Sequence, residues 1–168
     1  MNLDYELIDT GDGERLERWG SVLLRRPDPQ IIWEKHMNES AWNDVHAKFT
    51  DAWEIIKPIY EPWTLSYGDV KLKAQLTSFK HTGIFPEQED NWTWMITKLQ
   101  KPSRVLNLFA YTGAASMIFA KAGHQVTHVD ASKPALDWAA ENQKLSGLPS
   151  DSIRWMLEDA SKFVKREV

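Results

Sequence analysis

The sequence contains no cysteine among its 168 residues. Disulfide bonds, cysteine-ligated zinc and catalysis by a cysteine nucleophile are therefore excluded. Glycine is also scarce, with 8 residues, and no phosphate-binding loop of the G-x-x-x-x-G-K-[ST] type occurs. The 5 histidines show no metal-ligand spacing on a common element, so we expect no bound metal.

Long apolar runs are absent as well. No stretch approaches the roughly 18 residues that a membrane span needs, and the opening MNLDYELIDT has neither the basic nor the apolar region of a signal peptide. We therefore expect a cytoplasmic protein without membrane contact. The net charge of −4 gives no overall attraction to nucleic acid, which does not exclude a local basic face.

The most informative segment is RVLNLFAYTGAASMIFAKAGHQVTHVDAS, residues 104–132. The apolar run 105–109 is long enough for a buried strand and too short for a helix. Residues 114–122 favour a helix, and the β-branched run 126–129 predicts a second strand that ends in Asp130. This order is the first half of a nucleotide-binding α/β unit, in which ligands bind at the carboxyl ends of the strands.

The turn between the first strand and the helix suits an adenosine-like ligand that carries an anionic group. Unpaired backbone N–H groups where the helix opens near Gly113 attract an anion, and Asp130 has the spacing to hold ribose hydroxyls. The turn has one glycine, whereas dinucleotides need three against their pyrophosphate. It therefore fits the methionine part of S-adenosylmethionine better. An ordinary βαβ turn without a ligand is the alternative.

Four sequence motifs carry a family resemblance. NLFAYTG (107–113) and VTHVDAS (126–132) resemble motifs I and II of class I S-adenosylmethionine-dependent methyltransferases, in particular the bacterial large-subunit rRNA methyltransferase family. HTGIFPEQ (81–88) resembles the segment that precedes the fold in that family, and LEDA (157–160) resembles the acidic motif after the third strand. The resemblance implies S-adenosyl-L-methionine as cofactor.

The resemblance also implies a role for each site residue. The methionine end of the cofactor would lie in a turn formed by Asn107, Phe109, Ala110, Tyr111, Thr112 and Gly113. Asp130 would hold the ribose hydroxyls. Ala131 and Ser132 would line the adenine pocket, and Asp159 would accept a hydrogen bond from the adenine amino group. Phe85 and Gln88 would cap the site from the N-terminal side.

Three of these residues have structural alternatives. Asp159 suits the N-cap of a helix over 160–168. Gln88 suits a solvated position at the start of a helix over 89–99, and Phe85 suits the hydrophobic core.

The sequence departs from the family at its C-terminal end. The family's catalytic D-P-P-like tetrapeptide follows a fourth strand, and no such tetrapeptide occurs among the 168 residues. The catalytic residues are therefore unknown. We expect an α/β, partial Rossmann-like class I methyltransferase fold with the first three strands. Without the fourth strand, the strand 105–109 has an unpaired edge, which indicates a truncated chain, a homo-oligomer or a partner that completes the sheet.

A small β-rich module over 1–80 is expected to precede the cofactor-binding half over 81–168. The strand and turn signals predict strands over 5–8, 15–19 and 21–26, an irregular or partly helical linker over 31–51, and a hairpin of 63–67 with 70–77. In the second half they predict helices over 89–99, 134–145 and 160–168 and a third strand over 153–157.

The expected activity is S-adenosylmethionine-dependent methyl transfer, with RNA, in particular rRNA, as the substrate that the resemblance implies. A basic face for RNA would come from Arg15, Arg18, Arg25, Arg26, Lys71 and Lys73, with stacking by Trp19, Trp33 and Trp63. Solvated strand faces and core tryptophans explain the same residues. A non-catalytic cofactor- or RNA-binding module stays the alternative, and the single glycine argues against a dinucleotide oxidoreductase.

Overall fold

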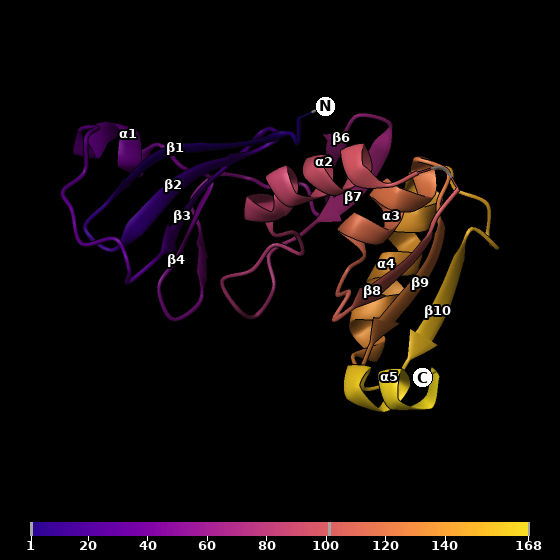
Figure 1. The fold of residues 1–168 in the computed structure, drawn as a ribbon. Helices are drawn as coiled ribbons and strands as arrows, with labels where there is room; N and C mark the ends of the chain where they lie inside the picture. The colour runs from indigo at the N-terminus through magenta and orange to yellow at the C-terminus, as the bar shows by residue number, and fades with distance from the viewer. Residues whose placement is uncertain (1, 101, 168) are drawn as a thin grey trace. The chain divides into compact units, whose positions relative to one another are not determined.

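The structure is a computed structural model that describes residues 2–100 and 102–167, and it divides into two compact units (Figure 1). The N-terminal unit comprises residues 3–65 and 74–83. The second unit contains the described residues 2, 66–73, 84–100 and 102–167, and it is called the nucleotide-binding unit below after the α/β unit that the sequence predicts. The sequence suggests a division between 1–80 and 81–168, which stays a prediction. In the structure, residues 66–73 group with the nucleotide-binding unit.

A five-stranded sheet forms the N-terminal unit, in the order β1-β2-β3-β4-β5. The strands β1 (Tyr5–Gly11), β2 (Glu14–Trp19) and β3 (Val22–Pro27) form an antiparallel meander. β4 (Ala47–Phe49) joins β3 in parallel, and β5 (Trp53–Ile55) pairs back on β4. The first three strands confirm the β-rich prediction for this part of the chain.

The prediction of an irregular or partly helical linker over 31–51 is confirmed in part. This stretch contains the helix α1 (Glu39–Asn43) and the strand β4. α1 begins where the Asn38 side chain accepts a hydrogen bond from the Ala41 amide, 3.1 Å away. The strand β4 and the bounds of α1 could not be predicted, because five helical residues and three strand residues are too short to show a hydrophobic period.

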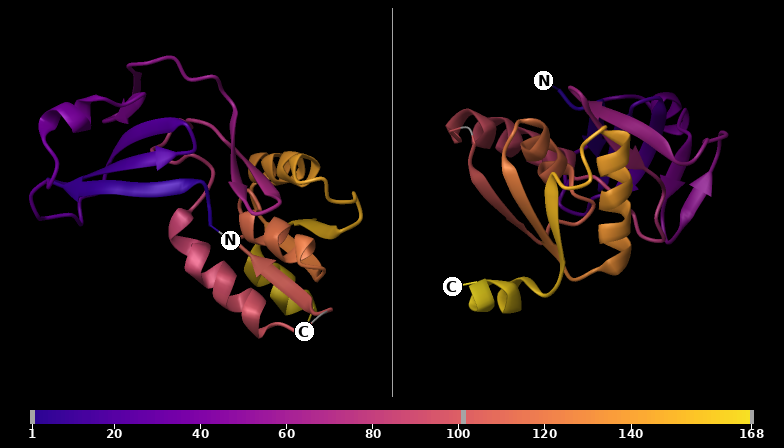
Figure 2. Two further views of the ribbon diagram at one scale, coloured as in Figure 1. Left: turned by 90° about the horizontal axis from the view of Figure 1, so that it is seen from above. Right: turned by 90° about the vertical axis from the view of Figure 1, so that its right-hand side faces the viewer.

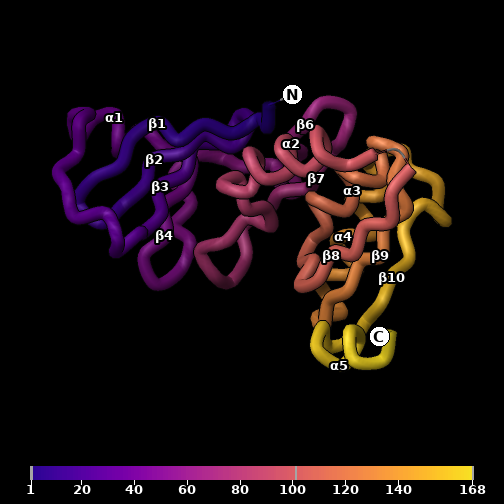
Figure 3. Tube along the Cα trace, in the orientation of Figure 1, coloured from indigo at the N-terminus to yellow at the C-terminus, as the bar shows by residue number. Residues whose placement is uncertain are grey.

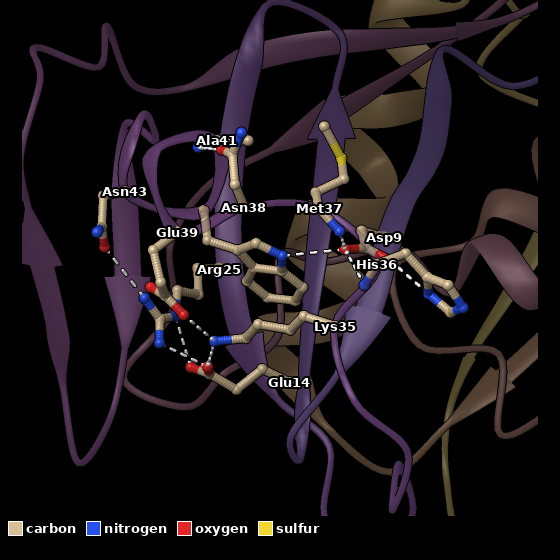
Figure 4. A network of polar contacts seen from close by, with 11 residues as sticks. Asp9, Glu14, Arg25, Lys35, His36, Met37, Asn38, Glu39, Ala41 and Asn43 are labelled. Carbon is tan, nitrogen blue, oxygen red and sulfur yellow. Dashed lines mark hydrogen bonds and ion pairs between the residues drawn. The ribbon is translucent and has the colours of Figure 1, made fainter.

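Buried Asp9 ties this stretch to the sheet (Figure 4). Its Oδ2 accepts hydrogen bonds from the Met37 amide at 2.8 Å and from Trp42 Nε1 at 3.0 Å. Burial alone would raise the pKa of Asp9, but these bonds and those from Thr10 and His36 outweigh it and lower the pKa below its ordinary value. The residues after β3 are therefore fixed by side-chain hydrogen bonds.

Three parallel strands in the order β10-β9-β8 form the sheet of the nucleotide-binding unit. They are β8 (Arg104–Leu108), β9 (Gln125–Asp130) and β10 (Ile153–Leu157). Parallel neighbours need crossover helices, and α3 (Ala114–Lys121) and α4 (Lys133–Leu145) supply them. The chain from β8 through α3 to β9 can be followed in Figure 3. Both crossovers confirm the predicted α/β class.

The remaining helices of this unit lie before β8 and after β10 in the chain. The short helix η1 (Pro86–Gln88) leads into α2 (Glu89–Lys98), and α5 (Ala160–Glu167) follows β10. Figure 2 shows α4 running alongside β10. The core consists of fully or almost fully buried apolar side chains, including Met117, Ile118, Phe119, Val126, Val129, Ala139, Ile153 and Phe163.

The hairpin of β6 (Trp63–Tyr67) and β7 (Val70–Ala74) appears where the sequence predicts it. Three α4 side chains, four residues apart, meet the β7 backbone. Ser146 Oγ accepts a bond from the Lys71 amide and donates one to the Lys71 carbonyl, both at 3.0 Å. Asn142 Oδ1 accepts from the Lys73 amide at 2.7 Å, and Trp138 Nε1 donates to the Lys73 carbonyl at 3.2 Å.

β8 differs from the buried strand that its apolar sequence predicts. Within the described residues it pairs with β9 alone, and Leu106 is 49% exposed. The strand ends at Leu108, so Phe109 belongs to the turn and not to the strand. The sheet order therefore agrees with the predicted unpaired edge at β8. Whether a second copy or another partner covers this edge stays a prediction.

Candidate functional site

The turn between β8 and α3 has a left-handed backbone at every second residue. The φ angles are +54° at Phe109, +52° at Tyr111 and +81° at Gly113. Residues with a Cβ rarely adopt such angles, because each left-handed residue with a Cβ costs on the order of 1 kcal/mol of conformational free energy. The turn contains a single glycine, yet two aromatic residues share its left-handed conformation. Strain of this kind is retained where the surrounding structure enforces it, often at functional sites.

Gly113 is needed for packing. A Cβ at this position would lie 3.1 Å from Ala139 Cβ, 3.1 Å from Met117 Cε and 3.3 Å from His128 Cε1. The tight contacts of the turn with α3, α4 and β9, together with the positive φ, therefore favour glycine at this position.

Asp130 stands at the carboxyl end of β9 and fixes the turn. Its Oδ2 accepts a hydrogen bond from the Tyr111 amide at 2.7 Å, and its Oδ1 accepts one from the Ser132 amide at 2.8 Å. Each carboxylate oxygen has a further lone pair. The half-buried carboxylate can therefore accept two more bonds, which is what a ribose diol requires.

The aromatic rings of Phe85 and Tyr111 lie beside each other, with centroids 5.4 Å apart and planes inclined by 42°. Phe85 is 38% exposed, which argues against the alternative that it is a core residue. Burial, and secondarily the charge of Asp130, raise the pKa of the Tyr111 hydroxyl. The Tyr111 side chain is therefore uncharged at neutral pH.

Three neutral polar side chains close to the turn are linked by polar contacts. Asn107 Nδ2 donates to Ser116 Oγ at 2.9 Å, and Ser116 Oγ lies 3.0 Å from His128 Nδ1. Burial lowers the pKa of His128 to about 4, against a smaller opposing effect of Asp130. His128 is therefore neutral at pH 7, and within the described residues its Nε2 has no hydrogen-bond partner. Ser116 was not identified from the sequence.

Asn142 was also missed, and it links the turn to β7. Its Nδ2 donates to the Thr112 carbonyl at 2.9 Å while its Oδ1 accepts from Lys73. The side chain is fully buried. A signal was present in the sequence, because Asn142 lies four residues from both Trp138 and Ser146 on a single face of the predicted helix.

The remaining predicted residues lie at the edges of their elements. Ser132 is the N-cap of α4, with Oγ accepting from the Ala135 amide at 3.4 Å. Asp159 Oδ1 accepts from the Lys162 amide at 3.0 Å, as the N-cap alternative predicts. Gln88 is exposed at the start of α2 and accepts from Asn91. Their roles toward a cofactor, and that of exposed Ala131, stay predictions.

Five of the six residues of the expected basic face form ion pairs, whereas Lys71 donates a hydrogen bond to Ser66 Oγ at 2.6 Å. Each of the four arginines forms an ion pair with an acidic residue: Arg15 with Asp28, Arg18 with Glu6, Arg25 with Glu14 and Arg26 with Glu17. Lys73 pairs with Glu141. Trp19 and Trp63 are buried, whereas Trp33 is 49% exposed. Of the three tryptophans considered for stacking, only Trp33 presents an accessible ring.

Two further observations concern ions and membranes. Residues 2–100 and 102–167 contain no group of three or more histidine, aspartate or glutamate side chains placed to hold a metal ion. No helix in this described part of the chain has the length and apolar character that crossing a membrane requires.

No protein-family model matches the chain. Ribosomal RNA large subunit methyltransferase I of Aeromonas salmonicida is 32% identical over 106 residues, which cover 62% of this chain and 26% of that protein. Ribosomal RNA large subunit methyltransferase K/L of Pseudomonas aeruginosa is 36% identical over 107 residues, which cover 57% of this chain and 14% of that protein. The matched region therefore spans 26% and 14% of these two relatives.

The structure resembles a crystal structure described as the SAM-dependent methyltransferase from Agrobacterium tumefaciens. The TM-score is 0.93 and the sequence identity 43%, and the match covers 98% of this chain and 55% of that one. The turn, the three parallel strands and the sequence motifs thus agree with one another. In sequence and in fold, the chain resembles class I S-adenosylmethionine-dependent methyltransferases, and its curated relatives are methyltransferases of large-subunit ribosomal RNA.

Proposed function

We propose that this chain binds S-adenosylmethionine at the carboxyl ends of β8 and β9 and contributes the cofactor-binding half of an RNA methyltransferase. The observation that carries the proposal is the hydrogen bond from the Tyr111 amide to Asp130. It holds a left-handed turn beside a carboxylate, at the edge of a parallel sheet where ligands bind. The names of the relatives support both the cofactor and an RNA acceptor.

The residues of this edge fit the cofactor. The carboxylate of the cofactor suits the amide groups at the N-terminus of α3, because the first turn of a helix has unpaired N–H donors. Its ribose diol suits the two remaining lone pairs of Asp130. When bound, the cofactor supplies an electrophilic methyl group on a sulfonium sulfur. The side chains described here would bind and orient it, since proximity and orientation account for much of the rate of such transfers.

The Asp130 carboxylate also has a structural part in this arrangement. It fixes the Tyr111 and Ser132 amides at once, so the turn and the start of α4 depend on a single side chain. A loss of binding in Asp130→Ala would therefore mix two causes. Asp130→Asn is the sharper variant, because the amide oxygen keeps one acceptor while the charge and the second acceptor are lost.

Isothermal titration calorimetry with S-adenosylmethionine, S-adenosylhomocysteine and NAD tests the proposal on the 168-residue chain. We expect saturable binding of the first two ligands, no binding of NAD, and at least about tenfold weaker binding in Asp130→Asn, since charge-assisted hydrogen bonds contribute about 1.5–3 kcal/mol each. Asp137→Ala, an exposed aspartate of α4 paired with Lys133, is the matched control and should bind as the parent does.

The outcomes separate cofactor from substrate. A folded chain that binds neither methionine-derived ligand contradicts the cofactor assignment. Binding without transfer of labelled methyl to large-subunit ribosomal RNA leaves the cofactor assignment intact and contradicts turnover by this chain alone. The alternative, a non-catalytic module, predicts the second result.

A further inference from the structure

The pair of aromatic rings at the turn lies outside the fully buried core. Phe85 is 38% exposed and Tyr111 is half-buried, and the two ring centroids lie 5.4 Å apart with planes inclined by 42°. Tyr111 occupies a left-handed backbone position that glycine would occupy without strain. Backbone strain of this kind clusters at functional sites.

The place of Tyr111 relative to the two anchoring points indicates that use. Tyr111 lies two residues before Gly113, where α3 opens toward an anion, and its own amide is bonded to Asp130, the candidate ribose ligand. In S-adenosylmethionine, a positively charged sulfonium sulfur connects the methionine chain to the ribose. A cofactor held at both ends would bring its sulfonium close to Tyr111, because this residue lies between the two anchoring points.

We propose that Phe85 and Tyr111 form an aromatic recognition site for the sulfonium cation, so that the chain distinguishes the charged methyl donor from its neutral product. This inference rests on the proposed function, because it concerns the same site. The negative faces of aromatic rings attract cations within about 6 Å. An inclined pair offers two such faces from two segments, one before η1 and one after β8.

Neutrality of the rings is part of the argument. The Tyr111 hydroxyl stays protonated at neutral pH because burial and the nearby Asp130 raise its pKa. The ring therefore acts through its quadrupole and not as a phenolate. Asp130 contributes a formal negative charge, but both of its oxygens already accept backbone hydrogen bonds, so part of its charge is committed to the turn.

The test uses two ligands that differ by a methyl group and a positive charge. Dissociation constants of S-adenosylmethionine and S-adenosylhomocysteine are measured by calorimetry for the parent chain, Tyr111→Leu, Phe85→Leu and the double variant. Leucine keeps apolar bulk near the methyl group and removes the aromatic face. We expect each single variant to weaken S-adenosylmethionine about fivefold, as a cation–π contact of about 1 kcal/mol implies, and S-adenosylhomocysteine less than twofold.

Conservative variants separate recognition from structure. Tyr111→Phe keeps the ring and the backbone requirement, so it should keep the ratio of the two dissociation constants. Phe79→Leu removes an aromatic ring that is 71% exposed in the N-terminal unit, and it should change neither constant.

Each remaining outcome has a distinct meaning. Equal weakening of both ligands in Tyr111→Leu and Phe85→Leu would show that the rings pack against the shared parts of the ligands, and it would overturn the inference. Unchanged binding in the double variant would overturn it as well. Absence of binding to the folded parent chain would contradict the proposed function itself.

Discussion

The two units use different kinds of polar interaction. The N-terminal unit places charged pairs between its strands, and the innermost is Glu17, fully buried, with a bidentate bond from Arg26 at 2.6 and 2.7 Å and a bond from the Tyr5 hydroxyl at 2.8 Å. The nucleotide-binding unit instead buries neutral polar side chains, namely Asn142, Ser116 and His128.

This difference shows how burial and charge are combined. A buried ion pair offsets its desolvation only while both partners are present, so the N-terminal sheet depends on complementary charges. A buried amide or hydroxyl needs a matching donor or acceptor and no countercharge. The buried polar groups beside the turn are neutral, so none of them offsets the negative charge of the Asp130 carboxylate. That charge is therefore available to a ligand.

The largest expected effect comes from breaking the innermost charged pair. In Glu17→Gln the Arg26 guanidinium stays buried without a countercharge, and we expect the free energy of unfolding to fall by about 3–5 kcal/mol. Urea unfolding measures the change, and hydrogen exchange of peptides from β2 and β3 assigns it to the N-terminal unit.

The matched control is Glu6→Gln, which breaks a pair between the same two strands as the Tyr5–Glu17 bond. Glu6 and Arg18 are 59% and 48% exposed, so this change should cost less than about 1 kcal/mol. Similar losses in the two variants would remove burial as the reason for the difference.

An intermediate effect is expected from acid, and it should act first on the nucleotide-binding unit. The pKa of His128 in the folded chain is about 4, below the ordinary value of about 6.5. As the pH falls below 6.5, the unfolded chain takes up a proton that the folded chain does not, so stability is lost between pH 6.5 and 4. From pH 7.5 to pH 5 this amounts to about 2 kcal/mol.

The carboxylates of the N-terminal unit should respond at lower pH, whereas burial lowers the pKa of His46, so that this histidine loses its contribution below pH 6.5 as the histidine of β9 does. Burial raises the pKa values of Asp9, Glu14 and Asp28, but hydrogen bonds and positive partners outweigh it and lower all three below their ordinary values. Their contribution is present above about pH 4 and is lost as the pH falls further. Region-resolved hydrogen exchange at pH 7.5, 5 and 3.5 tests this order. Loss of protection in β1–β3 before β9 would contradict it.

The smallest expected effect concerns the strained turn. Phe109 is 76% exposed at φ +54°, so Phe109→Gly removes little buried area and relieves the left-handed strain. Because glycine also increases the entropy of the unfolded chain, we expect a net gain in stability of at most about 1 kcal/mol. Leu106→Gly, in β8, should instead destabilise. A loss of more than 1 kcal/mol in Phe109→Gly would mean that the ring packs more tightly than its exposure indicates.

The sequence predicts the nucleotide-binding unit well because its signals are local. Apolar runs of strand length, Gly123 after α3, Ser132 before α4 and the acidic end of β9 each mark an element within one or two residues of its observed bounds. The positions of Asp130 and the turn at one edge follow from the parallel sheet. The sequence therefore identified the edge at which the candidate site lies.

Features that depend on distant residues could not be read in the same way. The roles of Asn142 and Ser116 come from partners 30 and 9 residues away, and the neutralised arginines come from the register of β1, β2 and β3. The left-handed angles of Phe109 and Tyr111 were hidden because propensity assigns such angles to glycine. Tertiary contacts determine each of these features.

The contact of α4 with β7 has a consequence for solubility. An open strand edge is a template on which other chains can add, which leads to aggregation. Lys71 and Lys73 direct backbone groups toward Ser146, Asn142 and Trp138, so a helix terminates the hairpin where a third strand would otherwise continue it. β7 is thereby closed to intermolecular β-pairing along this edge, a protection obtained from three side chains and not from charge or proline.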